Sequence, residues 1–389
     1  MPILYSYLLS EMAAPFLASL VILTGVLFLG QLLQTFTMVF ALGIGWVDFL
    51  RLTLYLLPKL MMFSMPLASM LAVVLAFNRL AVDREFLALR AAGVKLRQIV
   101  APVAIFALTV SCLAGYSTIV LMPKGLINME FLMLKLAREK IDRSIQEGTF
   151  SDSLSGIVAY VDRIDPATRE WQQVYLFDGR NKEQPMTITA KAAHLTADYA
   201  SLLLGLHLTN GAIDFIDSQI SRHIDFDRYS ISLPVALPKS AVDKGRKPTK
   251  MSQSELLAAA GNGDTPVART MLIEYHQRII LAAGCFILTI LGLTFAARSR
   301  PGVRPLALPA GMFCFLLYYV LFSFAETTAK NDALPLPLPL IVWTPNLLFL
   351  AITALLVLRM DKDALLPLPH VLTALWEKMA GRRQQGPRP

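Results

Sequence analysis

The sequence has little charge, few cysteines and none of the common catalytic signatures. Only 16% of its 389 residues are charged and 55% are hydrophobic, a composition too apolar for a soluble domain of this length. Its three cysteines, Cys112, Cys285 and Cys314, all lie in apolar runs, where a free thiol serves as a small packing residue. The polar middle of the chain has no cysteine, which excludes disulfides and thiolate metal sites there.

Motifs for nucleotide binding and hydrolysis are also missing. No G-x-x-x-x-G-K-[ST], H-E-x-x-H or G-x-S-x-G occurs, so the sequence predicts no phosphate loop, catalytic zinc helix or nucleophile elbow. The leading MPILYSYLLSEM lacks a basic region and a cleavage site, and we expect the first apolar run to stay in the membrane. Ile3, Leu4, Tyr7 and Leu8 share one helical face, which predicts a short amphipathic helix at the membrane surface.

Long apolar runs are what the chain has in place of these motifs. About 20 apolar residues cross the core of a bilayer. Six runs reach or approach this length: residues 13–39, 52–78, 98–122, 272–297, 306–328 and 341–359. The sequence therefore predicts a membrane protein with six spans.

Basic residues cluster on one side of these spans. Arginines and lysines gather at 79–97, at 298–304 and after residue 359, while the links 40–51 and 329–340 hold one basic residue each. Because basic loops stay in the cytoplasm, both termini are predicted to be cytoplasmic and the polar middle to lie outside. This asymmetry accounts for the net charge of +8, and no nucleic-acid partner is expected.

The polar middle combines a helix with alternating strands. Residues 124–146 are predicted to be helical, and after residue 148 apolar residues recur at every second position. Turn dipeptides at Asp165-Pro166, Asp178-Gly179 and Asn210-Gly211 separate the segments, a pattern typical of an antiparallel β-sandwich or jelly roll. Its interior would be a hydrophobic core or a cradle for an acyl chain. The alternation places Leu202, Leu204, Leu206 and Leu208 on one face of a strand, and Ile224 and Phe226 on one face of a later strand.

The polar side chains of this middle region give no clear sign of chemistry. His194, His207 and His223 each fall on a separate strand; a metal triad is possible, but surface histidines are the simpler interpretation. Asp225 and Asp227 share one strand face and are interpreted as solvent-facing carboxylates. We therefore predict no catalytic residues and no metal site.

A few charges fall within or beside the spans. Lys59 lies inside the second span, where a charge is either functional or snorkels to the outer interface. Glu274 and Arg278 at the start of the fourth span, like Glu326 and Lys330 at the end of the fifth, are four residues apart. Each couple is predicted to form an ion pair on one helical face at the outer interface.

One short charged segment interrupts the apolar runs. DREFLALRAAGVKLR at 83–97 links the second and third spans on the cytoplasmic side, and its composition predicts a helix. Its charges do not segregate as in a membrane-surface helix, and its alanines and Gly93 allow another protein to approach closely. Two interpretations stay open: a helix that docks in a groove of a cytoplasmic partner, and a helical loop whose basic residues only set the orientation.

Four local motifs occur in order along this topology. They are VDREFLALRAAGV at 82–94, EYHQRI at 274–279, RSRPGVR at 298–304 and WTPN at 343–346. Together with three spans, a large β domain and three further spans, they resemble the LptF/LptG (YjgP/YjgQ) family of lipopolysaccharide export permeases. The similarity covers nearly the whole chain, and the last three motifs are closer to LptF than to LptG.

The expected fold class is an α-helical integral membrane protein with six transmembrane helices and an inserted extracytoplasmic antiparallel β-sandwich or jelly-roll domain. The expected domains are transmembrane helices one to three at 1–122, with a coupling helix at 83–97; a periplasmic β-jelly-roll domain with flanking helices at 123–269; transmembrane helices four to six at 270–360; and a cytoplasmic tail at 361–389.

The resemblance implies a permease subunit of an ABC-type exporter in the bacterial inner membrane. Such a subunit extracts lipopolysaccharide from the outer leaflet and passes it to a periplasmic jelly-roll bridge. The implied partners are an LptG-like permease subunit as heterodimer, an LptB-like ATPase dimer that binds the ATP, and LptC-like and LptA-like periplasmic proteins. The chain itself is expected to be no enzyme and to hold no cofactor. The alternatives are a membrane-anchored enzyme built on the β domain and an envelope assembly scaffold; co-purification with a cytoplasmic ATPase separates both from the exporter.

The resemblance also implies two sets of site residues. In the cytoplasmic helix, Glu85 is the acidic residue expected to contact the ATPase, and the whole coupling set is Arg84, Glu85, Phe86, Leu89, Arg90 and Gly93. The first and fifth spans are expected to line lateral gates and a lipid cavity with Gln31, Gln34, Thr37, Phe315, Tyr318, Tyr319 and Phe322. Family members can carry basic residues at the outer end of the first span, but QLLQTFTM at 31–38 has none. Amides and a hydroxyl there would bind lipid phosphate more weakly than arginine does.

Overall fold

The computed structural model describes residues 2–42, 45–94, 96–154, 156–181, 185–198, 203–215, 222–233, 247–261, 265–297, 307–331 and 336–359. Its helices are α1 (Pro2–Leu42), α2 (Trp46–Val82), α3 (Glu85–Ala91), α4 (Leu96–Tyr116), α5 (Met122–Ser144), α6 (Gln253–Ala260), α7 (Pro266–Ala296), α8 (Ala307–Lys330) and α9 (Leu338–Leu358), with a π-helical turn η1 (Ser117–Leu121) and a 3₁₀ turn η3 (Pro248–Lys250). Its strands are β1 (Phe150–Leu154), β2 (Ile157–Ile164), β3 (Trp171–Asp178), β4 (Met186–Asp198), β5 (Leu203–Phe215) and β6 (Arg222–Leu233).

Six helical stretches among the described residues are long and apolar enough to cross a membrane, which confirms the predicted spans. The first differs at its start. The residues that were expected to form a separate surface helix are the opening turns of α1, which runs without a break from Pro2 to Leu42. Pro15 stands at the junction between the leading residues and the apolar run, and α1 continues through it.

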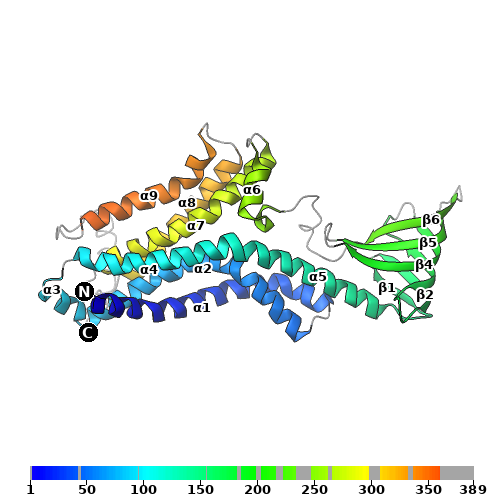
Figure 1. The fold of residues 1–389 in the computed structure, drawn as a ribbon, viewed down its shortest axis with the longest axis horizontal. Coiled ribbons are helices and arrows are strands. Elements are labelled where there is room, and N and C mark those ends of the chain that lie inside the picture. The colour runs from blue at the N-terminus through cyan, green and yellow to red at the C-terminus, as the bar shows by residue number, and fades with distance from the viewer. Residues whose placement is uncertain are drawn as a thin grey trace, which may run out of the picture.

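The third span continues beyond the bundle. A single helical rod, interrupted only by the π-helical turn η1, extends from α4 through α5 and ends at Ser144 beside β1. Figure 1 shows α5 leaving the other helices and reaching the sheet, while α3 and the start of α1 lie at the opposite end of the bundle. We call these the sheet end and the α3 end.

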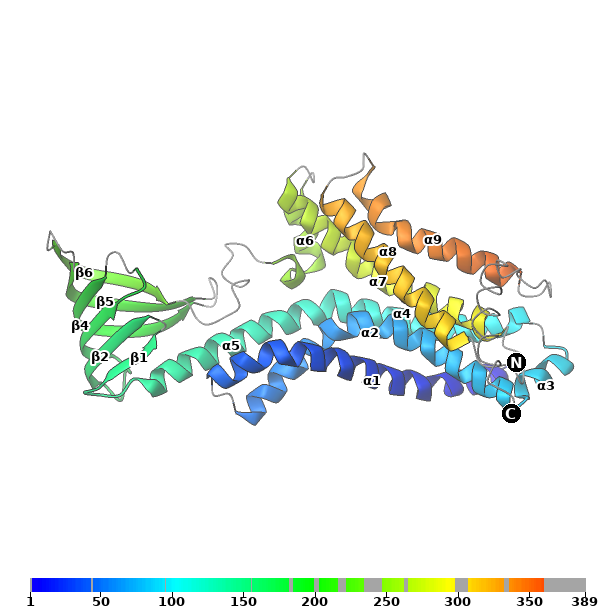
Figure 2. The same ribbon diagram turned by 180° about the vertical axis from the view of Figure 1, so that it is seen from behind.

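α2 and α7 form the centre of the bundle. In their most apolar stretches 72% of the residues are buried, against 11% in α1 and 22% in α8. The two central helices approach closely because Gly292 faces the backbone and side chain of Met70, where an added Cβ would lie 2.9 Å from the nearest atom. The Ser69 hydroxyl accepts a 2.8 Å hydrogen bond from Thr289 across the same contact. Figure 2 shows α6 beside α7 and α8 at the sheet end of this bundle.

The strands form one antiparallel sheet in which each strand pairs with the next along the chain, in the order β1 to β6. The antiparallel class is therefore confirmed, and the described pairings form a six-stranded meander. Turns follow β2 at Asp165 and β3 at Asp178, as predicted. The predicted turn at Asn210-Gly211 is wrong, because both residues lie inside β5.

A transverse bend replaces that turn. Five residues, one on each strand from β2 to β6, drop out of the pairing ladder along a single line: Asp162, Gln173, Lys191, Asn210 and Asp227. Gln173 and Asn210 have positive φ angles of 49° and 51°. Buried residues on either side of the line are three apart, as Trp171 and Val174 show, instead of two. The bend therefore turns both halves of the sheet toward the same interior.

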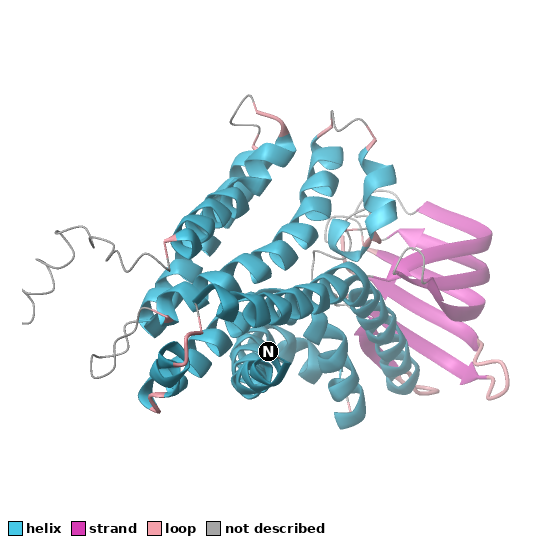
Figure 3. Ribbon diagram, turned by 60° about the vertical axis from the view of Figure 1, so that its left-hand side comes forward, coloured by secondary structure: helices cyan, strands magenta, loops and turns pink. Residues whose placement is uncertain are grey.

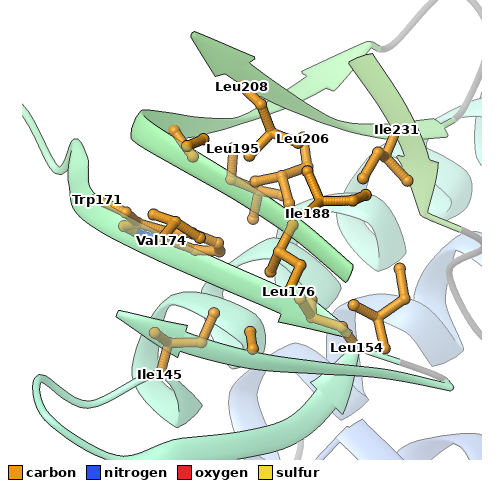
Figure 4. Packing of buried hydrophobic residues seen from close by; sticks show 14 of the residues in the cluster. Ile145, Leu154, Trp171, Val174, Leu176, Ile188, Leu195, Leu206, Leu208 and Ile231 are labelled. Carbon is orange, nitrogen blue, oxygen red and sulfur yellow. The ribbon is translucent and has the colours of Figure 1, made fainter. Parts of the chain in front are cut away.

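The interior of the sheet is a hydrophobic core. Leu204, Leu206 and Leu208 are at most 1% exposed, as predicted; Leu202 lies outside the described residues, and Ile224 is 49% exposed on the edge strand. Figure 4 shows the core side chains converging inside the curled strands. Leu134 and Ala137 from α5 belong to the same cluster, so the helix that carries the sheet also closes its core. Figure 3 shows the strands gathered together on one side of the helices.

Candidate functional site

The charged segment at the α3 end contains a short helix between two tight turns. It was predicted as one helix over 83–97, but α3 spans only seven residues, Glu85–Ala91. Arg84 reverses the chain before it with φ 62°. After it, Gly93 takes φ 83° and the Val94 amide donates to the Leu89 carbonyl at 3.1 Å, which is the helix-ending arrangement that favours glycine. The glycine therefore ends the helix and orients α3.

Glu85 is bound to the first helix of the bundle. The Tyr7 hydroxyl of α1 donates a short hydrogen bond to the Glu85 carboxylate. Close by, Arg79 lies 3.4 Å from a Glu11 oxygen and 3.7 Å from an Asp83 oxygen. α1, the end of α2 and α3 are thus joined by polar contacts at the surface.

One side of α3 packs and the other is open. Phe86 meets Phe77 of α2 edge to face, with ring centroids 6.2 Å apart, and Val94 packs against the same core. Arg84 and Glu85 are exposed, and Leu89 is half-buried. The side chain of Arg90 lies outside the described residues. α3 therefore presents a surface that another protein can reach.

The residues predicted to line a lipid cavity separate into two groups. Gln31 is half-buried on α1; Gln34 and Thr37 lie on the same helix, with side chains outside the described set. On α8, Tyr319 and Phe315 are half-buried, and Tyr319 meets Phe63 of α2 at 5.6 Å between ring centroids. These two aromatic side chains remain candidates for lipid contact.

Tyr318 and Phe322 do not face an open cavity, contrary to the expectation. They are 1% and 2% exposed. The Tyr318 hydroxyl donates a 2.7 Å hydrogen bond to Asn346 of α9, whose amide donates at 2.9 Å to the Ile280 carbonyl of α7. Gly284 leaves room for this hydroxyl, since a Cβ there would lie 2.2 Å from it. Through Asn346, Tyr318 therefore connects α8 with α9 and α7 instead of contacting lipid.

The surfaces available to lipid or to a partner include the outer faces of α1 and α8. Large apolar side chains there are 40–70% exposed: Leu17, Val21, Ile22, Val26, Leu27 and Leu29 on α1, and Met312, Phe313, Leu316, Leu317, Val320 and Phe324 on α8. A narrow apolar groove of about 20 Å³ between α1, α2 and α5 is lined by Phe28, Leu32, Phe49, Leu52, Thr53, Leu56, Met129 and Met133. Met133 is followed on α5 by Leu134 of the sheet core, so the groove and that core adjoin along one helix.

The ion pair predicted for Glu274 and Arg278 is present, with Nε and Oε1 3.1 Å apart, but Arg278 is fully buried. Its two terminal nitrogens donate to backbone carbonyls of Met251 at 2.8 Å, Pro248 at 3.1 Å and Thr249 at 3.2 Å. This extension was not predicted. The pair of Glu326 and Lys330 is also present, at 2.6 Å, and is more exposed.

The remaining polar candidates stay apart. Lys59 is half-buried and has no ion-pair or hydrogen-bond partner among the described residues. His194 and His207 stack across β4 and β5 at 5.1 Å. His223 instead lies between Asp214 at 2.6 Å and Asp225 at 3.2 Å, and these carboxylates raise the pKa of its imidazole. The three histidines therefore do not converge on one point.

The topology, with a long helix leading into a curled sheet and an exposed short helix α3, agrees with the comparison to known families. The family model described as "Lipopolysaccharide export system permease LptF/LptG" matches residues 6–359. The chain belongs to this family. It is also 24% identical over 312 residues to an uncharacterised protein, RP871, of Rickettsia prowazekii (strain Madrid E), covering 78% of this chain and 86% of that protein.

Membership of the LptF/LptG family makes this chain a multi-pass lipopolysaccharide export permease. The match places α3, the six spans and the sheet within one family unit. The match does not distinguish LptF from LptG. The greater similarity to LptF stays a prediction that depends on the EYHQRI, RSRPGVR and WTPN motifs. RSRPGVR lies outside the described residues.

Proposed function

We propose that this LptF/LptG chain is the permease subunit that takes lipopolysaccharide from the outer leaflet of the bacterial inner membrane. It passes the lipid to a periplasmic jelly-roll bridge formed by LptC-like and LptA-like proteins. The observation that carries the proposal is the position of α3 and the sheet at opposite ends of one bundle (Figure 1), in a chain of this family. An energy input at one end and a lipid exit at the other require that arrangement.

The energy enters through α3. ATP binds to a separate LptB-like ATPase dimer, and the open side of α3 docks on it, with Glu85, Arg84 and Arg90 as the charged contacts. Phe86 transmits the displacement to α2 through Phe77. The contact between Tyr7 and Glu85 lets the same displacement reach α1.

The lipid path uses the exposed spans. α1 and α8 are the least buried spans, and an LptG-like subunit facing them encloses a cavity between the two proteins. Gln31, Gln34 and Thr37 then meet the lipid from α1, and Tyr319 and Phe315 from α8.

The orientation follows from the basic residues. Both termini and the 79–97 link lie in the cytoplasm, and the 130–265 region lies in the periplasm. The test is labelling of single cysteines from each side of the membrane after the three native cysteines are replaced. A cysteine at Arg84 should react only from the cytoplasmic side and one at Gln172 only from the periplasmic side; the reverse pattern rejects the topology.

The function is tested by co-purification and lipid release. The chain should purify with a cytoplasmic ATPase and a second permease subunit, and vesicles holding the complex should release lipopolysaccharide when ATP is supplied. Photo-crosslinkers at Gln31 and Tyr319 should capture the lipid, whereas one at the buried Tyr318 should not. A chain that purifies without an ATPase and captures no lipid would exclude the exporter.

A further inference from the structure

The chain that returns from the sheet is held at one place between α5 and α7. Pro248, Thr249 and Met251 present their carbonyls to the guanidinium of Arg278, at 3.1, 3.2 and 2.8 Å. In the middle of the same turn the Lys250 ammonium forms a short ion pair with Glu130 of α5. The next helix is tied down too, because Gln253 donates a 3.0 Å hydrogen bond to the Tyr275 carbonyl of α7.

Burial makes the loss of one partner in these contacts costlier than it would be at the surface. Arg278 is 0% exposed, and the side chains of Lys250 and Glu130 are only 13% and 15% exposed. A charge removed from water is tolerated only when its hydrogen-bonding groups are satisfied, and removal of one partner is then strongly unfavourable. The guanidinium binds only one conformation of this turn, because three carbonyls within residues 248–251 must all point at it.

The topology gives this turn a mechanical position. Among the described elements, α5 leads from the bundle into the sheet, and η3 is the first element after β6. Lys250 joins the returning chain to α5, and Arg278 joins it to α7, one of the two central helices. The two connections of the sheet are thus held at one point beside the bundle.

We propose that Arg278, Glu274, Lys250 and Glu130 form a clamp that fixes the sheet to α7 and passes the movement of that helix to the sheet during each transport cycle. The proposal rests on the proposed transport function. Arg278 acts as a positioning residue: it is buried among protein groups and contacts backbone carbonyls in place of lipid. The clamp keeps the sheet in a fixed position relative to the bundle while the ATPase moves the α3 end.

The experiment measures the position of the sheet in the complete complex with its partner permease and ATPase. Spin labels at Gln172 on β3 and Leu348 on α9, both exposed positions, report the distance distribution between sheet and bundle. Arg278→Lys keeps a charge but loses the fork that reaches three carbonyls. Lys250→Glu and Glu130→Lys each place like charges together, and the double variant restores an opposite pair.

Each single variant should broaden the distance distribution and reduce lipopolysaccharide release roughly tenfold, while ATPase co-purification and ATP hydrolysis stay within about twofold of wild type. The double variant should recover both the narrow distribution and the release. Narrow distributions in all single variants, or a double variant as impaired as the singles, overturn the clamp. If the wild-type complex releases no lipid, the transport function fails instead, and the distance widths still decide whether the clamp exists.

Discussion

The two ends of the helical bundle each hold an arginine, and they hold it in opposite ways. At the α3 end, Arg79 is 70% exposed and lies 3.4 and 3.7 Å from two carboxylates, and Glu85 is exposed beside Tyr7. At the sheet end, Arg278 is fully buried and its hydrogen bonds reach Glu274 and three carbonyls. Both ends contain arginine and glutamate, so burial and not composition separates them.

Burial decides what each end can do. Exposed ion pairs contribute little, typically about 0–1 kcal/mol, so the side chains at the α3 end can change partners at small cost. Buried pairs cannot separate without leaving a charge in an apolar medium. A surface that must bind and release another protein therefore belongs at the α3 end, and a fixed joint belongs at the sheet end.

The largest effect should come from breaking the buried pair. Glu274→Ala leaves the Arg278 guanidinium without its carboxylate, at a cost of about 3–5 kcal/mol. The matched control is Glu326→Ala, since Glu326 and Lys330 have the same spacing and a shorter distance of 2.6 Å but side chains 24% and 48% exposed. The control should cost under about 1 kcal/mol.

Thermal melting of both variants in the same detergent measures this difference. Glu274→Ala should melt well below wild type and Glu326→Ala within a few degrees of it. Equal shifts in the two variants would show that burial does not set the cost of losing one partner of such a pair.

The next effect concerns the exposed end and should appear in binding. Glu85→Arg places a cation where α3 meets the ATPase, and loss of a charged contact at such an interface costs about 2–5 kcal/mol. The membrane fold should keep its melting temperature because Glu85 is exposed. Pull-down of the ATPase and lipid release from vesicles measure the loss.

Two milder variants separate the contacts of Glu85. Glu85→Gln keeps hydrogen bonding and should bind the ATPase more strongly than Glu85→Arg. Tyr7→Phe removes only the contact with α1, with Tyr5→Phe as control, so it should lower coupling of ATP hydrolysis to release while binding stays near wild type. If Glu85→Arg binds the ATPase and exports lipid like wild type, the docking role of Glu85 is wrong, and residues 83–97 only set the orientation.

Much of the fold could be predicted because apolar runs and alternation are local signals. The six spans follow from composition alone, and the inward leucines of β5 follow from period-two alternation. Asn210-Gly211 misled for a physical reason. Asn210 uses its tolerance of positive φ (51°) for a bend inside β5 instead of a turn between strands, and at Gly211 an added Cβ would lie 2.0 Å from the Thr189 carbonyl oxygen of β4. A dipeptide cannot show whether its neighbours will pair with each other or with other strands.

The site could be predicted only where its contacts are local. Glu274 and Arg278 are four residues apart, so helical spacing predicts their pair. The carbonyl acceptors of Arg278 lie 27 to 30 residues before it and are backbone groups, which carry no residue signature. The donor to Glu85, Tyr7, is 78 residues away. Tyr318 was wrongly predicted to line a cavity, because a tyrosine in a span can either face a cavity or form a buried hydrogen bond. Its acceptor, Asn346, lies on another helix and cannot be recognised from local sequence.

A smaller effect compares glycines at the two ends. Gly125 brings α5 against α2, and a Cβ there would lie 2.4 Å from the Tyr55 carbonyl oxygen, so Gly125→Ala forces backbone movement costing about 1–3 kcal/mol. Gly93 has open space around it but φ 83°, and Gly93→Ala adds strain of about 1–2 kcal/mol. Melting should fall in the first variant, whereas protease sensitivity of α3 should rise in the second. A global loss from Gly93→Ala would contradict the local role of that turn.

The smallest effect tests burial within the sheet itself. His223 lies 2.6 Å from Asp214 and 3.2 Å from Asp225, with a side chain 58% exposed, and these carboxylates raise its pKa above the ordinary 6.5. Because the folded state holds the proton more tightly, this contact stabilises β5 and β6 fully below that ordinary value and is lost as the pH rises through the raised pKa. Hydrogen exchange of β5 and β6, compared with His223→Gln at each pH so that intrinsic rates cancel, should show protection by His223 below that ordinary value, and the protection should fade as the pH rises above it. Exposure to water should keep the difference slight and sensitive to salt. A protection as large as that lost in Glu274→Ala would mean that the charge contact alone, and not its burial, sets the strength of the joints in this permease.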